Sequence, residues 1–278
     1  MRINCRYVNS QGAIVDFLGE KSRVTAGNLH GRTWKPAVTA GTIGETVNYW
    51  KKEAYSITLT VTFRGSRTER LREIDRAQDC FEYDILHNAP GTLYYGDWFC
   101  RCFITSAEYS AGDLPTWIDE KINVYVPAAT WWHIQTYRIV KQVDSGISTA
   151  YPTIYPFTYE IDKKEAVFEN EHFTDTDCRM IIYGPANNVN ITISGTVYKV
   201  DHQILEREYL VIDTRDKLLP EEHCYLVRSD GSKVNCYNDR KTDIMQKLPS
   251  GSISVNYSRD YTVELQLLHG RSEPRWYQ

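Results

Sequence analysis

The chain of 278 residues contains no long apolar run, no strong excess of one charge and only three methionines. No stretch of about 18 apolar residues is present, so the sequence predicts no membrane-spanning helix. Residues 1–5 also lack the apolar core that marks a secretory leader. These absences predict a protein that is synthesised in the cytoplasm and has no membrane partner.

Charged residues nearly balance, with 32 Lys and Arg against 36 Asp and Glu, and the formal net charge is −4. A nucleic-acid binder gathers its basic residues on one face, and the sequence has no such cluster, so we expect no nucleic-acid sequence recognition. The seven cysteines are an odd number without the spacing of a disulfide framework. They are therefore predicted to be free thiols.

The usual motifs of nucleotide binding and hydrolysis are missing. The sequence contains no GxGxxG or GxxxxGK[ST] phosphate loop, no GxSxG elbow and no HExxH zinc motif. We accordingly predict no catalytic residue, no cofactor and no enzymatic activity. An enzyme that cleaves polysaccharides stays open as an alternative, because it needs only two carboxylates that meet in a cleft.

Three short clusters contain side chains that can bind metals: residues 172–178, Cys100 with Cys102, and residues 221–224. None has a second ligand pair at a recognised spacing, which a structural zinc site requires. Polar loop residues and buried cysteines, which pack as small apolar side chains, explain the three clusters more simply. We predict no metal site.

Aromatic residues and short alternating segments are abundant. The chain has 20 Tyr, 8 Phe and 7 Trp, residues that favour β-strands and protein interfaces. In residues 56–63 the apolar side chains Ile57, Leu59, Val61 and Phe63 alternate with Ser and Thr, as in a half-buried strand. Similar segments predict further strands at 121–126, 190–194, 208–213, 252–257 and 260–267. Many short strands separated by turns, such as the one at Asp230-Gly231, indicate an all-β protein.

One helix is predicted within this β pattern. Ser66 and Glu69 have the spacing of a capping box, which satisfies free amide donors at a helix start. Leu71, Ile74, Gln78, Phe81 and Ile85 then recur at three- and four-residue steps, which gives an apolar stripe broken only at Gln78. Residues 88–91, Asn-Ala-Pro-Gly, end the helix. We expect it to cover a sheet, with Arg70 and the other charged residues on the solvent face.

The middle of the chain resembles a linker. Residues 144–149 are mostly small and polar, and Tyr151-Pro152 and Tyr155-Pro156 favour extended backbone. We therefore predict an N-terminal domain at 1–145, a linker at 146–156 and a C-terminal domain at 157–278.

Five aromatic residues are candidate interface residues: Trp34, Tyr49, Trp50, Trp131 and Trp132. Neighbouring strand residues point to opposite faces, so at most one of each adjacent pair can lie in a core. Exposed Trp usually marks a protein interface. We rank a subunit contact first, plain core second and a sugar-stacking platform third.

The second half of the chain resembles phage distal tail proteins, the siphovirus-type tail component family. The resemblance is carried by segments 181–188, 191–198 and 210–213, by Lys-Leu-Pro-Ser-Gly at 247–251, and by Gly-Arg-Ser-Glu-Pro-Arg-Trp at 270–276. In the first half, an alternating strand, the 66–87 helix and residues 91–95 follow the order of that family's ring-forming domain.

This resemblance implies a ring-forming β-sandwich or split-barrel-like domain followed by a galectin-like β-sandwich. It further implies a structural virion protein, the distal tail or baseplate hub ring of a long-tailed phage or prophage, located at the virion tail tip. The implied partners are a hexameric ring of the chain itself, the tail tube protein, a tail-associated lysin or fibre protein, and a receptor-binding protein. The alternative is a carbohydrate-binding β-sandwich that contacts the host cell wall and presents an aromatic platform on residues 157–278.

Overall fold

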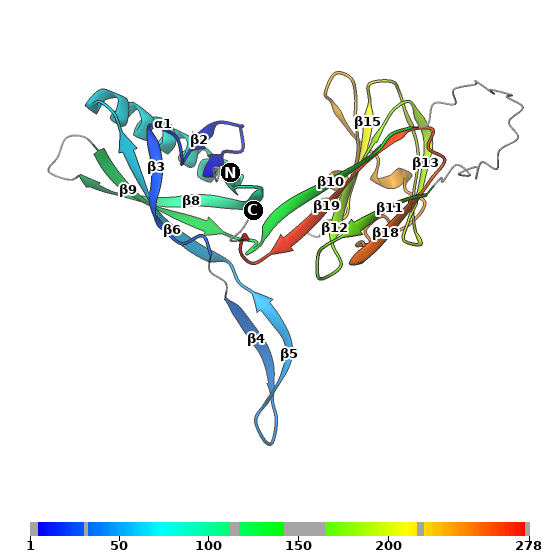
Figure 1. Ribbon diagram of the computed structural model, residues 1–278, viewed down its shortest axis with the longest axis horizontal. Coiled ribbons are helices and arrows are strands. Elements are labelled where there is room, and N and C mark those ends of the chain that lie inside the picture. The colour runs from blue at the N-terminus through cyan, green and yellow to red at the C-terminus, as the bar shows by residue number, and fades with distance from the viewer. Residues whose placement is uncertain (1–4, 31–32, 112–116, 142–164, 216–219, 276–278) are drawn as a thin grey trace, which may run out of the picture. The chain divides into compact units, whose positions relative to one another are not determined.

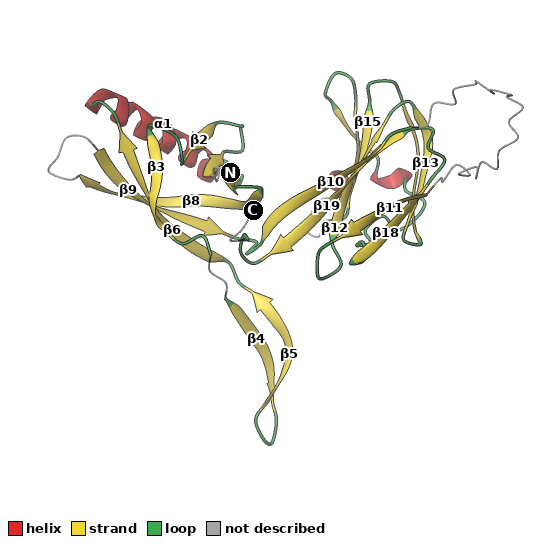
Figure 2. Cartoon of the chain, in the orientation of Figure 1, coloured by secondary structure: helices red, strands yellow, loops and turns green. Residues whose placement is uncertain are grey.

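The computed structural model describes residues 5–30, 33–111, 117–141, 165–215 and 220–275, and most of them lie in strands (Figure 2). The prediction of an all-β protein is therefore confirmed. The chain divides into two compact units, one formed by residues 1–133 and 270–278, the other by residues 134–269. The chain passes from the first unit to the second within strand β10 (Trp131–Ile139), and it returns to the first unit within strand β19 (Thr262–Arg271) (Figure 1). The predicted linker at 146–156 lies outside the described residues.

The first unit contains one antiparallel sheet in the order β2-β1-β7-β8-β9-β6-β3. Its long strand β8 pairs with β7 through its first residues and with β9 through its last, with an irregularity between Ile104 and Ser106. The strands are β1 (Cys5–Val8), β2 (Ile14–Asp16), β3 (Ser22–Gly27), β6 (Tyr55–Arg64), β7 (Gly91–Tyr95), β8 (Trp98–Ala111) and β9 (Trp117–Val126).

The core of this unit follows from strand alternation. In β6 the predicted apolar residues Ile57, Leu59, Val61 and Phe63 are all buried. Their neighbours in the core come from β9, β8 and the helix, which lies against β6, β8 and β2. A strand buried on one face thus forms where the sequence alternates with a period of two.

The predicted helix is confirmed as α1 (Arg67–Leu86), with Ser66 at its N-cap and the full capping box in place. The predicted apolar stripe is partly wrong, since Leu71 and Ile85 are 45% and 44% exposed. The face that is buried instead contains Ile74, Ala77, Cys80, Phe81, Asp84 and Arg70. Arg70 was expected in solvent, but it is buried and donates to the Gly65 carbonyl at 2.7 Å. Four residues of this face are small or polar, so a periodic pattern of large apolar residues does not reveal them: Arg70, Ala77, Cys80 and Asp84.

The contacts of Asp84 explain part of the difference between the predicted and the observed buried face of α1. Its carboxylate is fully buried and accepts hydrogen bonds from the Tyr7 hydroxyl at 2.5 Å, the Ser10 hydroxyl at 2.6 Å and the Ser10 amide at 2.8 Å. Glycine is required at Gly91, because a Cβ there would lie 2.3 Å from the Tyr7 hydroxyl oxygen. These contacts connect α1 to the end of β1, and a buried carboxylate is tolerated only with such partners.

The second unit is a sandwich of two antiparallel sheets, β17-β16-β15-β12-β19-β10 and β11-β18-β13-β14. The first sheet contains β10 (Trp131–Ile139), β12 (Asp177–Tyr183), β15 (Tyr209–Asp213), β16 (Cys224–Val227), β17 (Lys233–Asn235) and β19 (Thr262–Arg271). The second contains β11 (Glu165–Asn170), β13 (Ala186–Ile193), β14 (Thr196–Ile204) and β18 (Gly251–Asn256). Two short helices, α2 (Pro220–His223) and η1 (Tyr237–Asp239), complete the unit.

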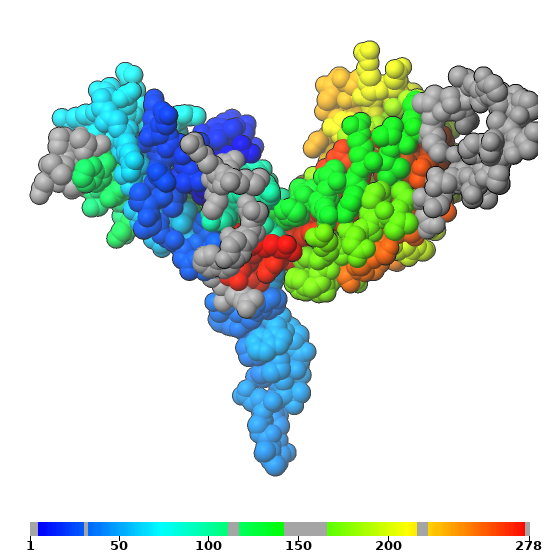
Figure 3. Space-filling model, in the orientation of Figure 1, coloured from blue at the N-terminus to red at the C-terminus, as the bar shows by residue number. Residues whose placement is uncertain are grey.

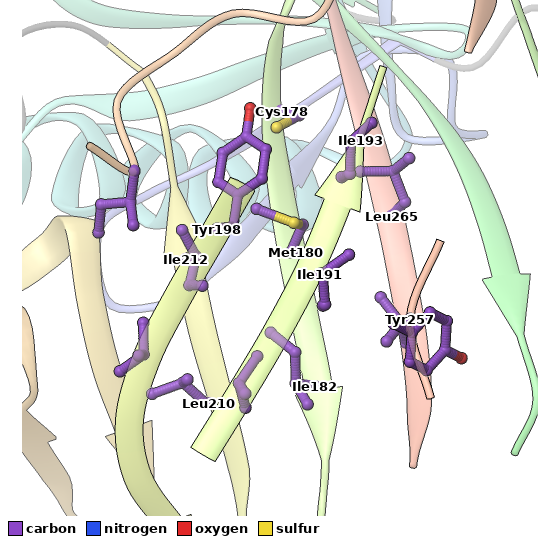
Figure 4. Close-up of a cluster of buried hydrophobic side chains, with 14 of the residues drawn as sticks. Cys178, Met180, Ile182, Ile191, Ile193, Tyr198, Leu210, Ile212, Tyr257 and Leu265 are labelled. Carbon is purple, nitrogen blue, oxygen red and sulfur yellow. The ribbon is translucent and has the colours of Figure 1, made fainter. Parts of the chain in front are cut away.

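The two sheets share one apolar core. Met180 and Ile182 of β12 lie against Ile191 and Ile193 of β13, and all four are buried (Figure 4). Such interdigitation of alternating side chains is what holds a β-sandwich together. None of the described helices has the length and apolar content that crossing a membrane requires.

Candidate functional site

A separate β-hairpin carries several exposed apolar side chains of the first unit. Strands β4 (Trp34–Ala40) and β5 (Glu45–Lys52) pair only with each other among the described strands. The turn between them is closed by a 2.9 Å hydrogen bond from the Gly41 amide to the Gly44 carbonyl. Figure 3 shows the hairpin standing clear of the sheet that carries it, and at its tip Ile43 is 97% exposed.

Both faces of the hairpin carry aromatic residues. Trp34 lies opposite Lys52, whose Nζ is 5.0 Å from the indole centroid, and Trp50 lies opposite Pro36. Tyr49 occupies the other face, and Lys51 approaches its ring at 5.9 Å. Tyr49 and Trp50 are each 57% exposed. A two-stranded hairpin is only marginally stable by itself, so exposed aromatic side chains on both faces suit a surface that a partner covers.

Three of the five candidate interface residues therefore meet on the hairpin, and the other two do not. Trp131 is fully buried in the core of the first unit, where its indole N–H donates to the Tyr55 hydroxyl at 2.9 Å. Trp132 is partly buried, and its ring packs so closely on the backbone that a Cβ at Gly270 would lie 2.9 Å from it. Trp131 thus belongs to the plain-core class that ranked second.

A groove of about 480 Å³ lies between the C-terminal half of α1 and strand β8. Phe81, Ile85 and Leu86 line it from the helix, and Ile104 and Tyr109 line it from the strand. Leu86 is 80% exposed, and the last turn of α1 carries no basic residue. The groove therefore combines apolar side chains with the polar Gln78, Thr105 and Ser106 and the acidic Glu82, and the helix end adds no positive charge.

Glu120 is buried beside this groove on β9. The Gln78 amide donates a hydrogen bond to its Oε1 atom. Burial raises the pKa of the Glu120 carboxyl to about 7, an effect that hydrogen bonds from Tyr109 and Gln78 partly oppose. A buried carboxyl resists ionisation because the low-dielectric interior disfavours charge, so this group titrates near neutral pH.

Among the described residues, none of the three clusters considered from the sequence forms a group of three or more metal-binding side chains. Cys100 and Cys102 are both buried in the core of the first unit, as expected for packed cysteines. Cys178 is buried in the other core, whereas the His172 ring contacts Thr174 in its own loop. Cys224 is also a residue of that core. The ring of its neighbour His223 contacts the Asp213 carbonyl at 2.8 Å. All seven cysteines are free and buried, which confirms the predicted thiols.

Comparison with known sequences identifies nothing: no family model matches the chain, and no curated protein does. Comparison with solved structures finds chains with a similar fold. A chain of the phage P2 baseplate in its activated conformation with Ca matches with a TM-score of 0.62 and 13% identity, over 99% of this chain and 100% of the other. The corresponding baseplate with Sr gives a TM-score of 0.62 and 12% identity, over 99% and 100%.

The SPP1 Dit (gp 19.1) protein, described as a paradigm of the hub adsorption apparatus in phages that infect Gram-positive bacteria, also matches. Its TM-score is 0.57 at 11% identity, over 98% of this chain and 100% of the other. At such low identity the likeness establishes the fold alone, but it extends over both units. Along nearly its whole length, the chain has the fold of phage baseplate hub and distal tail proteins.

Proposed function

We propose that this protein is the structural distal tail, or baseplate hub, ring of a long-tailed phage or prophage, located at the tail tip of the virion. The observation that carries the proposal is the likeness to baseplate hub chains over 98–99% of this chain and all of theirs. A shared domain alone would leave the function open, because one fold hosts many functions. Agreement over both units restricts the possible functions more than one shared domain would.

The hairpin supports the ring-forming part of this proposal. A cyclic ring needs two different complementary patches on each subunit. The exposed Trp34, Tyr49 and Trp50 make the hairpin the first patch. The second patch is the groove between α1 and β8, which is apolar at Leu86 and bears the acidic Glu82. Of the three hairpin lysines, Lys35 pairs with Glu53, whereas Lys51 and Lys52 lie beside aromatic rings and complement the charge of that rim.

The remaining partners follow from the same assignment. The proposed ring is a hexamer that joins the tail tube protein to a tail-associated lysin or fibre protein, and it can carry a receptor-binding protein. The first unit, residues 1–133 and 270–278, would form the ring, and the second unit, residues 134–269, would be the galectin-like domain. The chain would be synthesised in the bacterial cytoplasm.

We also propose that the protein is not an enzyme. The structurally similar baseplate and hub chains support this assignment, and so do the cysteines. Burial raises the pKa of the Cys5, Cys178 and Cys224 thiols to about 12, which disfavours the nucleophilic thiolate. The sugar-binding alternative has less support, because Phe173 is the one strongly exposed aromatic residue among the described part of the second unit.

Light scattering coupled to size exclusion, with negative-stain images of the same peak, tests the proposal. A ring of six 32.3 kDa chains would weigh about 194 kDa and show a central hole. The Tyr49→Ser/Trp50→Ser variant and Leu86→Ser should each dissociate the ring. Phe173→Ser, which removes an exposed aromatic residue from the second unit, is the matched control and should leave it intact.

Two outcomes would contradict the proposal at different levels. A chain that stays monomeric at high concentration, even with a tail tube protein present, would overturn the ring assignment and favour the sugar-binding module. A ring of full mass in the hairpin variant would retain the function but reject the hairpin as its interface.

A further inference from the structure

Three metal-binding side chains meet in the second unit, at a place that no sequence motif marks. His202 lies on β14, Cys236 immediately precedes η1, and Asp239 ends η1. One ligand atom from each residue lies within 4.8 Å of the other two. The imidazole Nδ1 of His202 is 2.8 Å from Oδ2 of Asp239. This is the one such group found among the described residues.

The backbone holds these three residues in place. The Asp239 amide donates to the Cys236 carbonyl at 3.0 Å, which closes the 3₁₀ turn and brings positions i and i+3 to one side. The Cys236 amide donates to the Cys224 carbonyl at 2.9 Å, and the Lys241 amide donates to the Lys199 carbonyl at 2.9 Å. These bonds fasten the η1 segment to β16 and to β14, so the donor atoms are positioned before any ion arrives.

The donor set has the chemistry and size of a zinc site. Nitrogen, sulfur and carboxylate oxygen are the ligands of Zn²⁺, whereas Ca²⁺ and Mg²⁺ take oxygen. Metal–ligand bonds of about 2.0–2.3 Å place tetrahedral ligands roughly 3.5 Å apart, so small side-chain shifts from the observed spacing suffice. Cys236 is buried, whereas His202 and Asp239 are partly exposed, which leaves a solvent side for a fourth ligand, water.

Nearby cations already have other partners. The guanidinium of Arg240 lies 3.7 Å from the Tyr237 ring centroid and donates to the Tyr237 carbonyl at 2.7 Å. The ammonium of Lys241 lies 3.7 Å from Asp201. Neither cation is paired with Asp239, whose hydrogen-bonding partner is the His202 ring.

We propose that His202, Cys236 and Asp239 bind one zinc ion, which fastens the η1 segment to strand β14. Zinc binds the lone pair of one imidazole nitrogen of His202, while the ring N–H lies on the other nitrogen, together with the Asp239 carboxylate and the Cys236 thiolate. Binding therefore releases the thiol proton of Cys236 to the buffer. Zinc binding at this three-ligand site is independent of whether the chain forms a ring.

Zinc titration of the full chain tests the site. Protein stripped with a chelator and dialysed should bind one zinc per chain, measured by competition with a chromophoric chelator. His202→Ala and Asp239→Asn remove partly exposed side chains, and each should weaken binding more than about tenfold. Asp201→Asn, a neighbour on β14 outside the donor set, should bind as the unaltered chain does. Cobalt substitution should give a thiolate-to-metal charge-transfer band that Cys236→Ser abolishes.

Zinc should also raise the melting temperature of the unaltered chain but not that of His202→Ala. Binding that survives in His202→Ala and Asp239→Asn would place the zinc elsewhere and overturn the proposal. A cobalt complex without the charge-transfer band would exclude Cys236 as a ligand. The absence of saturable binding in the unaltered chain would reject the site altogether.

Discussion

Replacing Glu120 with Gln should change how the stability of the first unit depends on pH. The Glu120 carboxyl is fully buried, and burial raises its pKa to about 7 from an ordinary value near 4.5. Between these two pH values the folded chain holds a proton that the unfolded chain has released. The free energy of unfolding therefore falls as the pH rises through this window.

The magnitude follows from the width of the window. One pKa unit corresponds to 1.36 kcal/mol, so this carboxyl contributes about 3 kcal/mol at low pH that is lost once the pH exceeds 7. Glutamine is neutral at every pH and keeps an oxygen that can accept from Gln78. The difference in unfolding free energy, Glu120→Gln minus unaltered chain, should therefore increase by about 3 kcal/mol between pH 4.5 and pH 8.

Urea denaturation at a series of pH values, followed by tryptophan fluorescence, measures this difference. Six of the seven tryptophans lie among the described residues, and all six belong to the first unit, so the signal reports on the unit that contains Glu120. Glu108→Gln, which removes an exposed carboxylate from β8, is the matched control. Parallel pH profiles for Glu120→Gln and the unaltered chain would refute the reasoning, because they would show that Glu120 ionises alike in the folded and unfolded chains.

Three further substitutions test the packing. Asp84→Ala leaves the Tyr7 hydroxyl and the Ser10 amide without their buried acceptor and should cost about 3 kcal/mol in urea denaturation, whereas Asp79→Ala on the exposed face should cost little. Gly184→Ala would place a Cβ 2.0 Å from the Leu205 carbonyl oxygen, so the melting temperature should fall sharply. Tyr198→Phe removes the donor to the Gln246 carbonyl at 2.9 Å and should cost about 1 kcal/mol. Equal stability of Asp84→Ala and Asp79→Ala, an unchanged melting temperature for Gly184→Ala, or an unchanged urea midpoint for Tyr198→Phe would each contradict the described contact.

Much of the secondary structure could be predicted because it depends on neighbours in the chain. Residues 56–63 alternate with a period of two, and they form the centre of β6 with Ile57, Leu59, Val61 and Phe63 buried. Ser66 and Glu69 mark the start of α1 because the capping box is a local contact. The turn at Asp230-Gly231 is likewise present, with Gly231 at a φ of +84°.

Residues whose burial depends on distant partners were harder to assign. Leu71 and Ile85 have a helical spacing with Ile74 and Phe81, yet they are exposed, because α1 turns Asp84 and Arg70 toward β1 and the loop before the helix. The β4–β5 hairpin escaped prediction as an element, since both its faces are exposed and its sequence has no one-sided apolar pattern.

The sequence by itself determined the all-β class, the positions of the main strands and of one helix, and a resemblance to phage distal tail proteins with which the shared fold agrees. Only the tertiary structure decided that Trp131 is core while Trp50 is exposed, and that His202 meets Cys236 and Asp239. The physical reason is the distance along the chain over which each effect acts. Periodicity and capping act over a few residues, whereas burial and the meeting of side chains depend on which strands pair across the fold, and spacing along the chain does not encode that pairing.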